Sequence, residues 1–249
     1  MISIKKKIKQ LIKNLTGLHL YRRLPRGTEL LHDIRVSLSG YVVDVVFDVG
    51  ANVGQSAQQF IQDFPGSTIY CFEPAGDTFQ QLLENFQNQK QVYCFQNAMG
   101  FSERKGKLVH QGSSRMFFIA DPSQEDTLDQ NLNFEEVSII TLDNFCRNNK
   151  IHSISYLKID TEGADLDVLK GAETMLTDHR IDLVQVEAGM NCNNKRHVPF
   201  EVVKEFLEQK GYFLFAIYEQ FHESLTDEPH LRRTNPVFIS EKMIRAYRK

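Results

Sequence analysis

From Tyr41 onward, short apolar runs alternate with helical patterns, and this rhythm constrains the fold more than any other feature of the chain. The run at residues 42–47 is rich in β-branched side chains and is interrupted only by Asp44. Strands that alternate with helices form a largely parallel sheet with helices on both faces. We therefore expect an α/β, Rossmann-like fold. Its strands are expected at residues 42–47, 68–72, 92–95, 154–159, 182–186, 212–217 and 236–240.

Residues 97–141 interrupt this rhythm. They are rich in turn-forming residues and hold only short apolar runs, at residues 107–110, 117–119 and 137–140. Such a composition is typical of hairpins. We expect a β-hairpin insertion before the alternation resumes.

The first 26 residues form a basic arm with eight Lys and Arg and no Asp or Glu, although the whole chain has a net charge of -3. Apolar side chains recur at helical spacing from Ile4 to Leu18. The helix could lie on an anionic membrane surface or a partner, or it could pack on its own domain or a dimer mate. We expect residues 1–40 to be a basic amphipathic extension and residues 41–249 to be one compact domain.

Composition excludes some classes of protein. A net charge of -3 does not support a general nucleic-acid binder, which usually has a strong basic excess. No apolar run approaches the roughly 20 residues that span a bilayer, and the N-terminus lacks the apolar block of a secretion signal. We therefore expect a cytoplasmic protein. The four cysteines form no Cys-x-x-Cys pair, and Cys71 and Cys94 lie in apolar strand-like runs, so we expect reduced core thiols.

A glycine-rich turn, Asp48-Val49-Gly50-Ala51-Asn52-Val53-Gly54, follows the first expected strand. Glycines let the backbone turn tightly and approach a ligand, and the next helix directs its free N–H groups toward it. A dinucleotide fingerprint needs Gly-x-Gly-x-x-Gly, but Gln55 stands where the third glycine belongs. The turn therefore argues against a pyrophosphate cradle.

Glu73 ends the second expected strand, about 20 residues beyond the turn, where an acid can accept hydrogen bonds from ribose hydroxyls. The ligand would then be a nucleoside that needs no pyrophosphate site. S-adenosylmethionine fits this description, with Asp48 and the turn backbone available to its aminocarboxylate end.

Three acids stand at or just after the ends of two later strands: Asp160, Glu162 and Glu187. Beside a sulfonium they could stabilise positive charge, orient a substrate hydroxyl, act as general base or hold a divalent cation. Asp160 and Glu162 also have a structural interpretation, because they precede a helix and could cap its N-terminus.

These residues resemble a known family. The segments Phe47-Asp48-Val49-Gly50-Ala51-Asn52-Val53-Gly54, Phe72-Glu73-Pro74, Thr141-Leu142-Asp143, Leu157-Lys158-Ile159-Asp160-Thr161-Glu162-Gly163-Ala164-Asp165 and Val168-Leu169-Lys170-Gly171-Ala172 look like those of FkbM methyltransferases, which depend on S-adenosylmethionine. The resemblance covers residues 41–221, and the segment around Asp160 is its most specific part.

The resemblance implies a seven-stranded class I methyltransferase sheet and O-methylation of a hydroxyl on a small molecule, sugar or polysaccharide. It implies cofactor binding by Asp48, Gly50, Asn52, Gly54 and Glu73, with Asn97 and Ala98 at the adenine. No full set of metal ligands is legible, so we assign none. Asp160 is the first candidate for the catalytic base, with Glu162 and Glu187 as alternatives.

Two other functions compete with this one. Asp165-Leu166-Asp167 spells the Asp-x-Asp of glycosyltransferases, but residues two apart do not share a helix face, so we interpret both as surface charges. The fold could also serve as a non-catalytic binding module.

Overall fold

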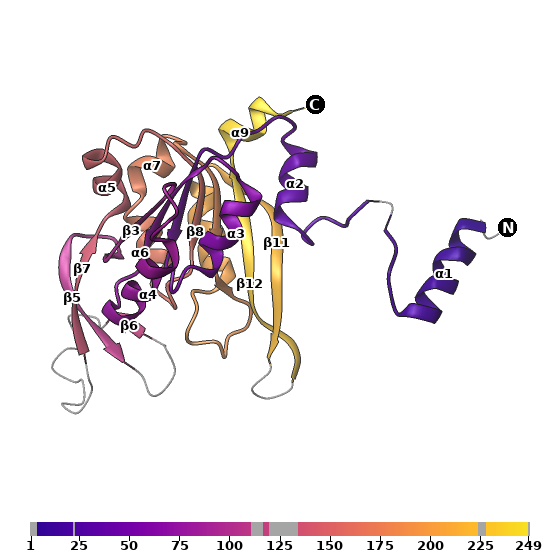
Figure 1. Ribbon diagram of the computed structural model, residues 1–249, viewed down its shortest axis with the longest axis horizontal. Coiled ribbons are helices and arrows are strands. Elements are labelled where there is room, and N and C mark those ends of the chain that lie inside the picture. Colours follow the sequence, from indigo (N-terminus) through magenta and orange to yellow (C-terminus); the bar gives the residue numbers. More distant parts are fainter. Residues whose placement is uncertain (1–3, 22, 111–116, 120–133, 224–227, 249) are drawn as a thin grey trace.

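The computed structural model describes residues 4–21, 23–110, 117–119, 134–223 and 228–248 (Figure 1). Its main sheet places five parallel strands in a row: β3 (Val92–Phe95), β2 (Thr68–Phe72), β1 (Val45–Val49), β8 (Ile154–Ile159) and β9 (Ile181–Val186). Beyond β9, β12 (Glu228–Ser240) runs antiparallel and pairs with β11 (Tyr212–Glu223) and with the two-residue β10 (Ala188–Gly189). The expected Rossmann-like sheet of seven strands is confirmed, and β10 adds a short eighth strand within the described residues.

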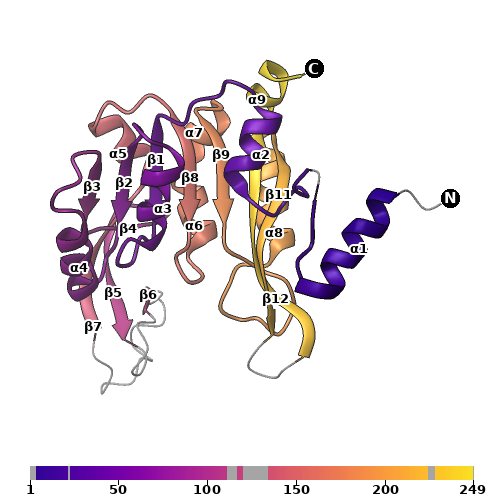
Figure 2. The same ribbon diagram turned by 45° about the vertical axis from the view of Figure 1, so that its right-hand side comes forward.

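Helices cover both faces of this sheet, as the alternation predicts (Figure 2). Neighbouring residues of a strand point to opposite faces, so Val46 of β1 packs in one core cluster and Phe47 in the other. The Val46 cluster is covered by α2 (Leu30–Ser37), α3 (Gln55–Asp63), α4 (Gly76–Phe86) and α9 (Glu241–Ala246). The Phe47 cluster is covered by α5 (Leu142–Asn148), α6 (Asp165–Lys170), α7 (Glu173–Thr177) and α8 (Phe200–Gln209).

A second, smaller sheet is built from the segment expected to hold hairpins. Its strands are β4 (Ala98–Met99), β5 (Arg104–His110), β6 (Phe117–Ile119) and β7 (Phe134–Ile140), and β5 runs antiparallel to both β6 and β7. It lies beside α4 in both views, and the Glu135 carboxylate accepts the Gly76 N–H at 3.1 Å (Figures 1 and 2). The β-hairpin insertion is confirmed; residues 111–116 and 120–133 of it lie outside the described part of the chain.

Several strand boundaries differ from the expectation, and β1 begins at Val45 rather than at residue 42. β1 continues past Asp48 because the buried carboxylate has a cationic partner on β8, which a single strand pattern cannot reveal. The β11–β12 hairpin extends beyond its apolar residues. There the Arg233 guanidinium lies 4.0 Å from the centre of the Phe221 ring, so side chains across the strands stabilise it.

The two helices described within the first 40 residues differ in their packing. α2 belongs to the core, because Ile34 is buried with the Val46 cluster. α1 (Ile4–Thr16) stands apart from the sheet in both views, and Leu11 and Leu15 are 59% and 76% exposed (Figures 1 and 2). The division of the chain at residue 40 stays a prediction. Within the described residues, no helix has both the length and the apolarity to cross a membrane.

Candidate active site

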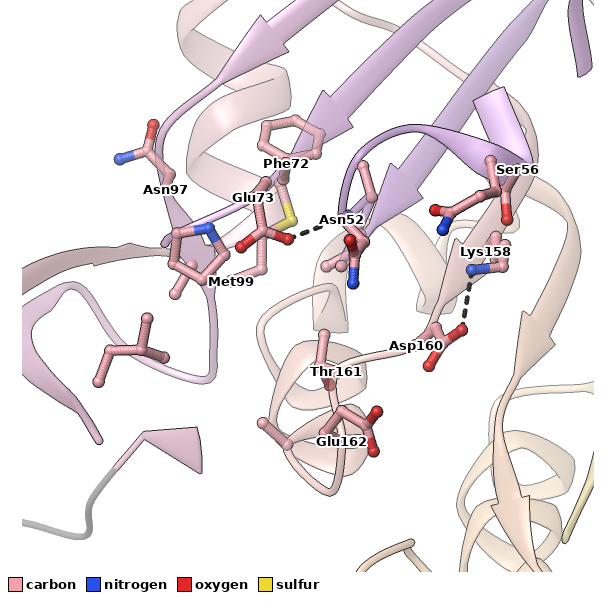
Figure 3. A pocket seen from close by; sticks show the side chains of 18 residues that line it. Asn52, Ser56, Phe72, Glu73, Asn97, Met99, Lys158, Asp160, Thr161 and Glu162 are labelled. Atoms are coloured by element: carbon pink, nitrogen blue, oxygen red, sulfur yellow. Dashed lines mark hydrogen bonds and ion pairs between the residues drawn. The ribbon is translucent and has the colours of Figure 1, made fainter. Parts of the chain in front are cut away.

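A cavity of about 390 Å³ opens at the carboxyl ends of β1, β2 and β8 (Figure 3). The chain order reverses between β1 and β8, which is where ligands bind in sheets of this kind. Seven of the ten residues predicted for the site line this cavity: Gly50, Asn52, Glu73, Asn97, Ala98, Asp160 and Glu162. The other three, Asp48, Gly54 and Glu187, do not line it.

The turn after β1 is fixed by close contacts with both neighbouring strands. The N–H groups of Gly50 and Ala51 donate to the carbonyl of Phe72 at 2.9 and 3.0 Å. Gly50 has a φ of +82°, and a Cβ there would lie 1.9 Å from the carbonyl oxygen of Asp160. Only glycine fits this position, so the backbone of the turn passes close to the end of β8 at the cavity.

Gly54 has a packing role. Its φ is +95°, and a Cβ would lie 2.1 Å from the ring of Phe86 on α4. The glycine therefore lets α3 begin close against α4, and this close packing accounts for the second glycine of the turn.

Glu73 lies in the cavity wall and is held by the backbone. Its carboxylate accepts the N–H of Asn52 at 3.0 Å and the N–H of Ala75 at 2.9 Å. Burial raises the pKa of Glu73, and these two hydrogen bonds oppose the rise. Each oxygen keeps a second lone pair for a further donor. Figure 3 shows Glu73 and Asn97 on one side of the cavity and Lys158 and Asp160 on the other.

A buried lysine links two of the predicted acids. The ammonium of Lys158 lies 3.5 Å from the Asp48 carboxylate and 3.1 Å from the Asp160 carboxylate. Burial alone would lower the pKa of Lys158, but the two carboxylates outweigh it and raise the pKa, so the lysine stays charged. Burial also raises the pKa of Asp48, against the charge of Lys158. Asp48 is fully buried behind this lysine, and Lys158 itself reaches the cavity.

Sequence analysis did not single out Lys158. The sequence does hold a signal for this residue: Lys158 is the one cation in β8, which is buried throughout. A charge in a strand that is buried on both faces needs a partner.

The loop after β8 is organised by Asp165, which was interpreted as a surface charge; that interpretation is wrong. Asp165 is fully buried and accepts the N–H groups of Thr161 at 3.3 Å and Gly163 at 3.1 Å. Burial raises its pKa to about 6. The N-cap position of α6 is Ala164, which has no side-chain cap, so neither Asp160 nor Glu162 caps the helix.

Glu187 lies beside the cavity in a polar cluster with Glu162 and His197. The His197 Nε2 is 2.8 Å from the Glu187 carboxylate and 3.7 Å from that of Glu162. One ligand atom of each lies within 4.8 Å of the others, so the trio has the residue types and spacing to hold a cation. Arg233 forms an ion pair with Glu187, and Arg196 forms one with Glu162. Glu162, Glu187 and His197 are not adjacent in the sequence, so sequence analysis did not reveal this cluster.

Two other segments of the resemblance are structural. The Asp143 carboxylate accepts the N–H groups of Thr174 at 2.7 Å and Met175 at 3.0 Å, at the start of α7. A Cβ on Gly171 would lie 2.0 Å from the carbonyl of Gly100, next to β4. These contacts join α5 to α7 and the end of α6 to the second sheet, and Asp143 and Gly171 lie outside the cavity.

Topology and cavity together define the class of protein. Five parallel strands and an antiparallel β11–β12 pair, with a glycine turn after β1 and an acid after β2, form the class I fold of S-adenosylmethionine-dependent methyltransferases. The chain belongs to the FkbM methyltransferase family, because the protein-family model described as "Methyltransferase FkbM domain" matches residues 48–214. The protein is therefore an enzyme, and the glycosyltransferase and binding-module alternatives are set aside.

Similar proteins come from several organisms. The chain is 24% identical over 246 residues to "2-O-methyltransferase NoeI" of Sinorhizobium fredii, covering 94% of this chain and 95% of that one. It is 25% identical over 167 residues to "Hexuronic acid methyltransferase AglP" of Haloferax volcanii, covering 67% and 63%. The solved structure of Aeropyrum pernix fibrillarin with S-adenosyl-L-methionine has a TM-score of 0.43 and 14% identity, over 93% of this chain and 74% of that one.

The raised pKa of Asp165 makes stability depend on pH. Folding raises it from 3.8 to about 6, so charging Asp165 destabilises the fold as pH rises through this range, and below pH 3.8 the effect is absent. Between pH 4 and 7, the unfolding free energy of Asp165→Asn should therefore gain on wild type by about 2 kcal/mol. Urea denaturation at several pH values measures this, with Asp167→Asn, at a half-exposed aspartate of the same helix, as the matched control. A difference that does not change with pH would contradict it.

Proposed function

We propose that this methyltransferase binds S-adenosylmethionine in the cavity described above and methylates a hydroxyl of a sugar or polysaccharide. The observation that carries the proposal is the cavity itself, which has Glu73, at the end of β2, on one side and Asp160, at the end of β8, on the other. The printed names of two relatives, a 2-O-methyltransferase and a hexuronic acid methyltransferase, support a sugar as the acceptor.

Each end of the cofactor has a partner of matching chemistry in this proposal. Asn97 and Ala98 line the cavity and would hold the adenine, and Glu73 would accept hydrogen bonds from the ribose hydroxyls. The turn at Gly50 and Asn52 would hold the methionine part. Because Asp48 is buried, we assign the carboxylate of that part to the Lys158 ammonium, which reaches the cavity.

The chemistry is an in-line displacement. When bound, S-adenosylmethionine would supply the methyl group: the acceptor oxygen would form a bond to the methyl carbon as the carbon–sulfur bond breaks, and a neutral thioether would leave. The hydroxyl proton passes to a carboxylate, for which Asp160 is our first choice and Glu162 our second. The enzyme contributes mainly alignment and exclusion of water, and the ion pair with Lys158 fixes the Asp160 carboxylate in place.

Removal of the Glu73 carboxylate should weaken cofactor binding. Glu73→Ala loses the proposed ribose acceptor and the partner of two backbone N–H groups. Hydrogen bonds to a charged group contribute about 1.5–3 kcal/mol each, so we expect the Kd for S-adenosylmethionine to rise at least tenfold. Calorimetry measures it, with Glu84→Ala on the exposed face of α4 as control. Unchanged affinity would remove Glu73 from the site.

The acceptor class can be tested with defined sugars. We expect transfer of labelled methyl to members of a panel of p-nitrophenyl glycosides that contains hexoses, a 6-deoxyhexose and a hexuronic acid. Catechol and a fatty acid are the non-sugar controls. Transfer to a control and to no glycoside would contradict a sugar acceptor, and it would leave the cofactor assignment intact.

We also propose that α1 binds an anionic membrane surface. It carries five lysines and no acid among its 13 residues, and the apolar side chains of Ile8, Leu11 and Leu15 are exposed. A helix with an apolar face and basic flanks is suited to the lipid interface. The cytoplasmic location of the protein also stays a prediction.

Binding to vesicles tests the role of α1. Each lysine near an anionic surface contributes about 1 kcal/mol, so Lys6→Gln with Lys9→Gln should weaken binding to phosphatidylserine vesicles on the order of 30-fold. Lys90→Gln with Lys150→Gln, on the exposed surface of the main domain, is the charge-matched control. Sedimentation with vesicles measures both. If the unsubstituted chain does not sediment with them, α1 does not bind an anionic membrane surface.

A further inference from the structure

A second cavity lies at the end of the main sheet opposite to the candidate active site. It has a volume of about 240 Å³. His152 stands just before β8 and Arg180 just before β9, so this cavity opens at the amino ends of these strands, where Figure 2 shows α5 and α7. The six residues of β8 span about 20 Å between the two cavities. A ligand here would therefore not touch a ligand in the candidate active site.

The lining of this second cavity, called the basic cavity below, has an excess of positive charge. Its three cationic side chains are those of Arg147, Lys150 and Arg180. None of the three forms an ion pair with a carboxylate of the described residues. The one acid of the lining, Asp143, accepts the N–H groups of Thr174 and Met175, one on each oxygen. The charges of the cations are therefore available to a ligand.

The guanidinium of Arg180 is held in place and still has hydrogens to donate. Its Nε donates to the carbonyl of His152 at 2.6 Å, and one terminal nitrogen donates to that of Ile151 at 3.2 Å. Arg147 donates to the side-chain oxygen of Asn144 at 2.7 Å. Because a guanidinium has five N–H groups, both arginines keep several for other acceptors. Such planar groups of donors match the oxygens of a phosphate.

Lys150 has a backbone conformation that a residue with a side chain seldom adopts. Its φ is +57°, in the left-handed region where glycine is common just after a helix. α5 ends at Asn148, and across this turn the N–H of Ile151 donates to the carbonyl of Cys146 at 2.9 Å. Glycine would form the same turn with less strain, so the turn does not require a lysine. The side chain of Lys150 instead adds its charge to the basic cavity.

The buried part of the lining is uncharged. It consists of Cys146, Ile151 and Met175. Burial raises the pKa of the Cys146 thiol to about 12, so at neutral pH the thiol does not repel an anion. Sites for drug-sized ligands have volumes of about 300–1,000 Å³, so the basic cavity suits a smaller molecule with a short organic part.

We propose that the basic cavity is a second binding site, which takes a small organic phosphate monoester. The phosphate accepts hydrogen bonds from Arg147, Lys150 and Arg180, and the organic part lies against the buried side chains. A phosphate monoester carries a charge of about −1.5 to −2 at neutral pH, which matches three cations and one acid. The proposal is independent of the proposed function, because it involves no residue of the candidate active site.

Titration of the full chain with glycerol 2-phosphate tests the proposal. Backbone amide shifts in nuclear magnetic resonance locate the site, at constant ionic strength and neutral pH. We expect saturable shifts at residues 146–152, 174–175 and 180, with a Kd on the order of 1 mM for a few charge-assisted hydrogen bonds in a cavity open to solvent. Inorganic phosphate should shift the same amides, and uncharged glycerol should not.

Variants separate binding from folding. Arg147→Gln and Lys150→Gln should each raise the Kd about fivefold or more, because each loses a charged donor. Lys90→Gln, an exposed lysine outside the basic cavity, is the charge-matched control and should leave the Kd unchanged. Lys150→Gly relieves the left-handed strain, so its melting temperature should equal or exceed that of wild type while its Kd rises as in Lys150→Gln.

Three results would overturn the proposal: no saturation, shifts confined to other amides, or wild-type affinity in both glutamine variants. A phosphate on a lipid headgroup has the same chemistry, and the sedimentation test of α1 separates the two sources. A small soluble ligand predicts that Lys90→Gln with Lys150→Gln leaves vesicle binding unchanged. Loss of vesicle binding in that variant would assign the basic cavity to a headgroup and overturn the choice of a small molecule.

Discussion

The buried ammonium of Lys158 is the interaction on which the rest of the site depends. It neutralises Asp48 in the interior of the sheet, which allows β1 to continue to the edge of the cavity, and it fixes Asp160 in the cavity wall. A charge pair of this kind does not add much stability by itself, but loss of one partner leaves an uncompensated charge in the interior. The same three residues therefore couple the integrity of the central strands to the geometry of the site.

Close backbone contacts set the remaining geometry. At Gly50 the turn meets the carbonyl of Asp160, and at Gly171 the end of α6 meets the carbonyl of Gly100. Contacts so short leave no room for a side chain, so the distances between these segments are fixed by the main chain. The segments that carry Glu73, Asp160 and Glu162 therefore keep a fixed spacing in the cavity wall.

The local pattern of apolar residues was sufficient to predict most of the fold, because the spacing of apolar side chains shows which face of a strand or helix is buried. The strands expected at residues 68–72, 92–95 and 154–159 coincide with β2, β3 and β8. The site was harder to predict where a role depends on a distant partner. Burial of Asp48 behind Lys158, of Asp165 under its own loop and of Glu187 beside His197 depends on contacts across strands, which periodicity along one strand does not contain.

Only the chain between residues 17 and 29 connects α1 to α2. Thirteen residues can span at most about 45 Å when fully extended. If α1 binds a membrane surface, this linker limits how far the cavity can move from that surface. The cavity then reaches only acceptors that lie within about the linker's length of it. Such a tether replaces a three-dimensional search by a local one, which raises the effective concentration of acceptors attached to the same surface.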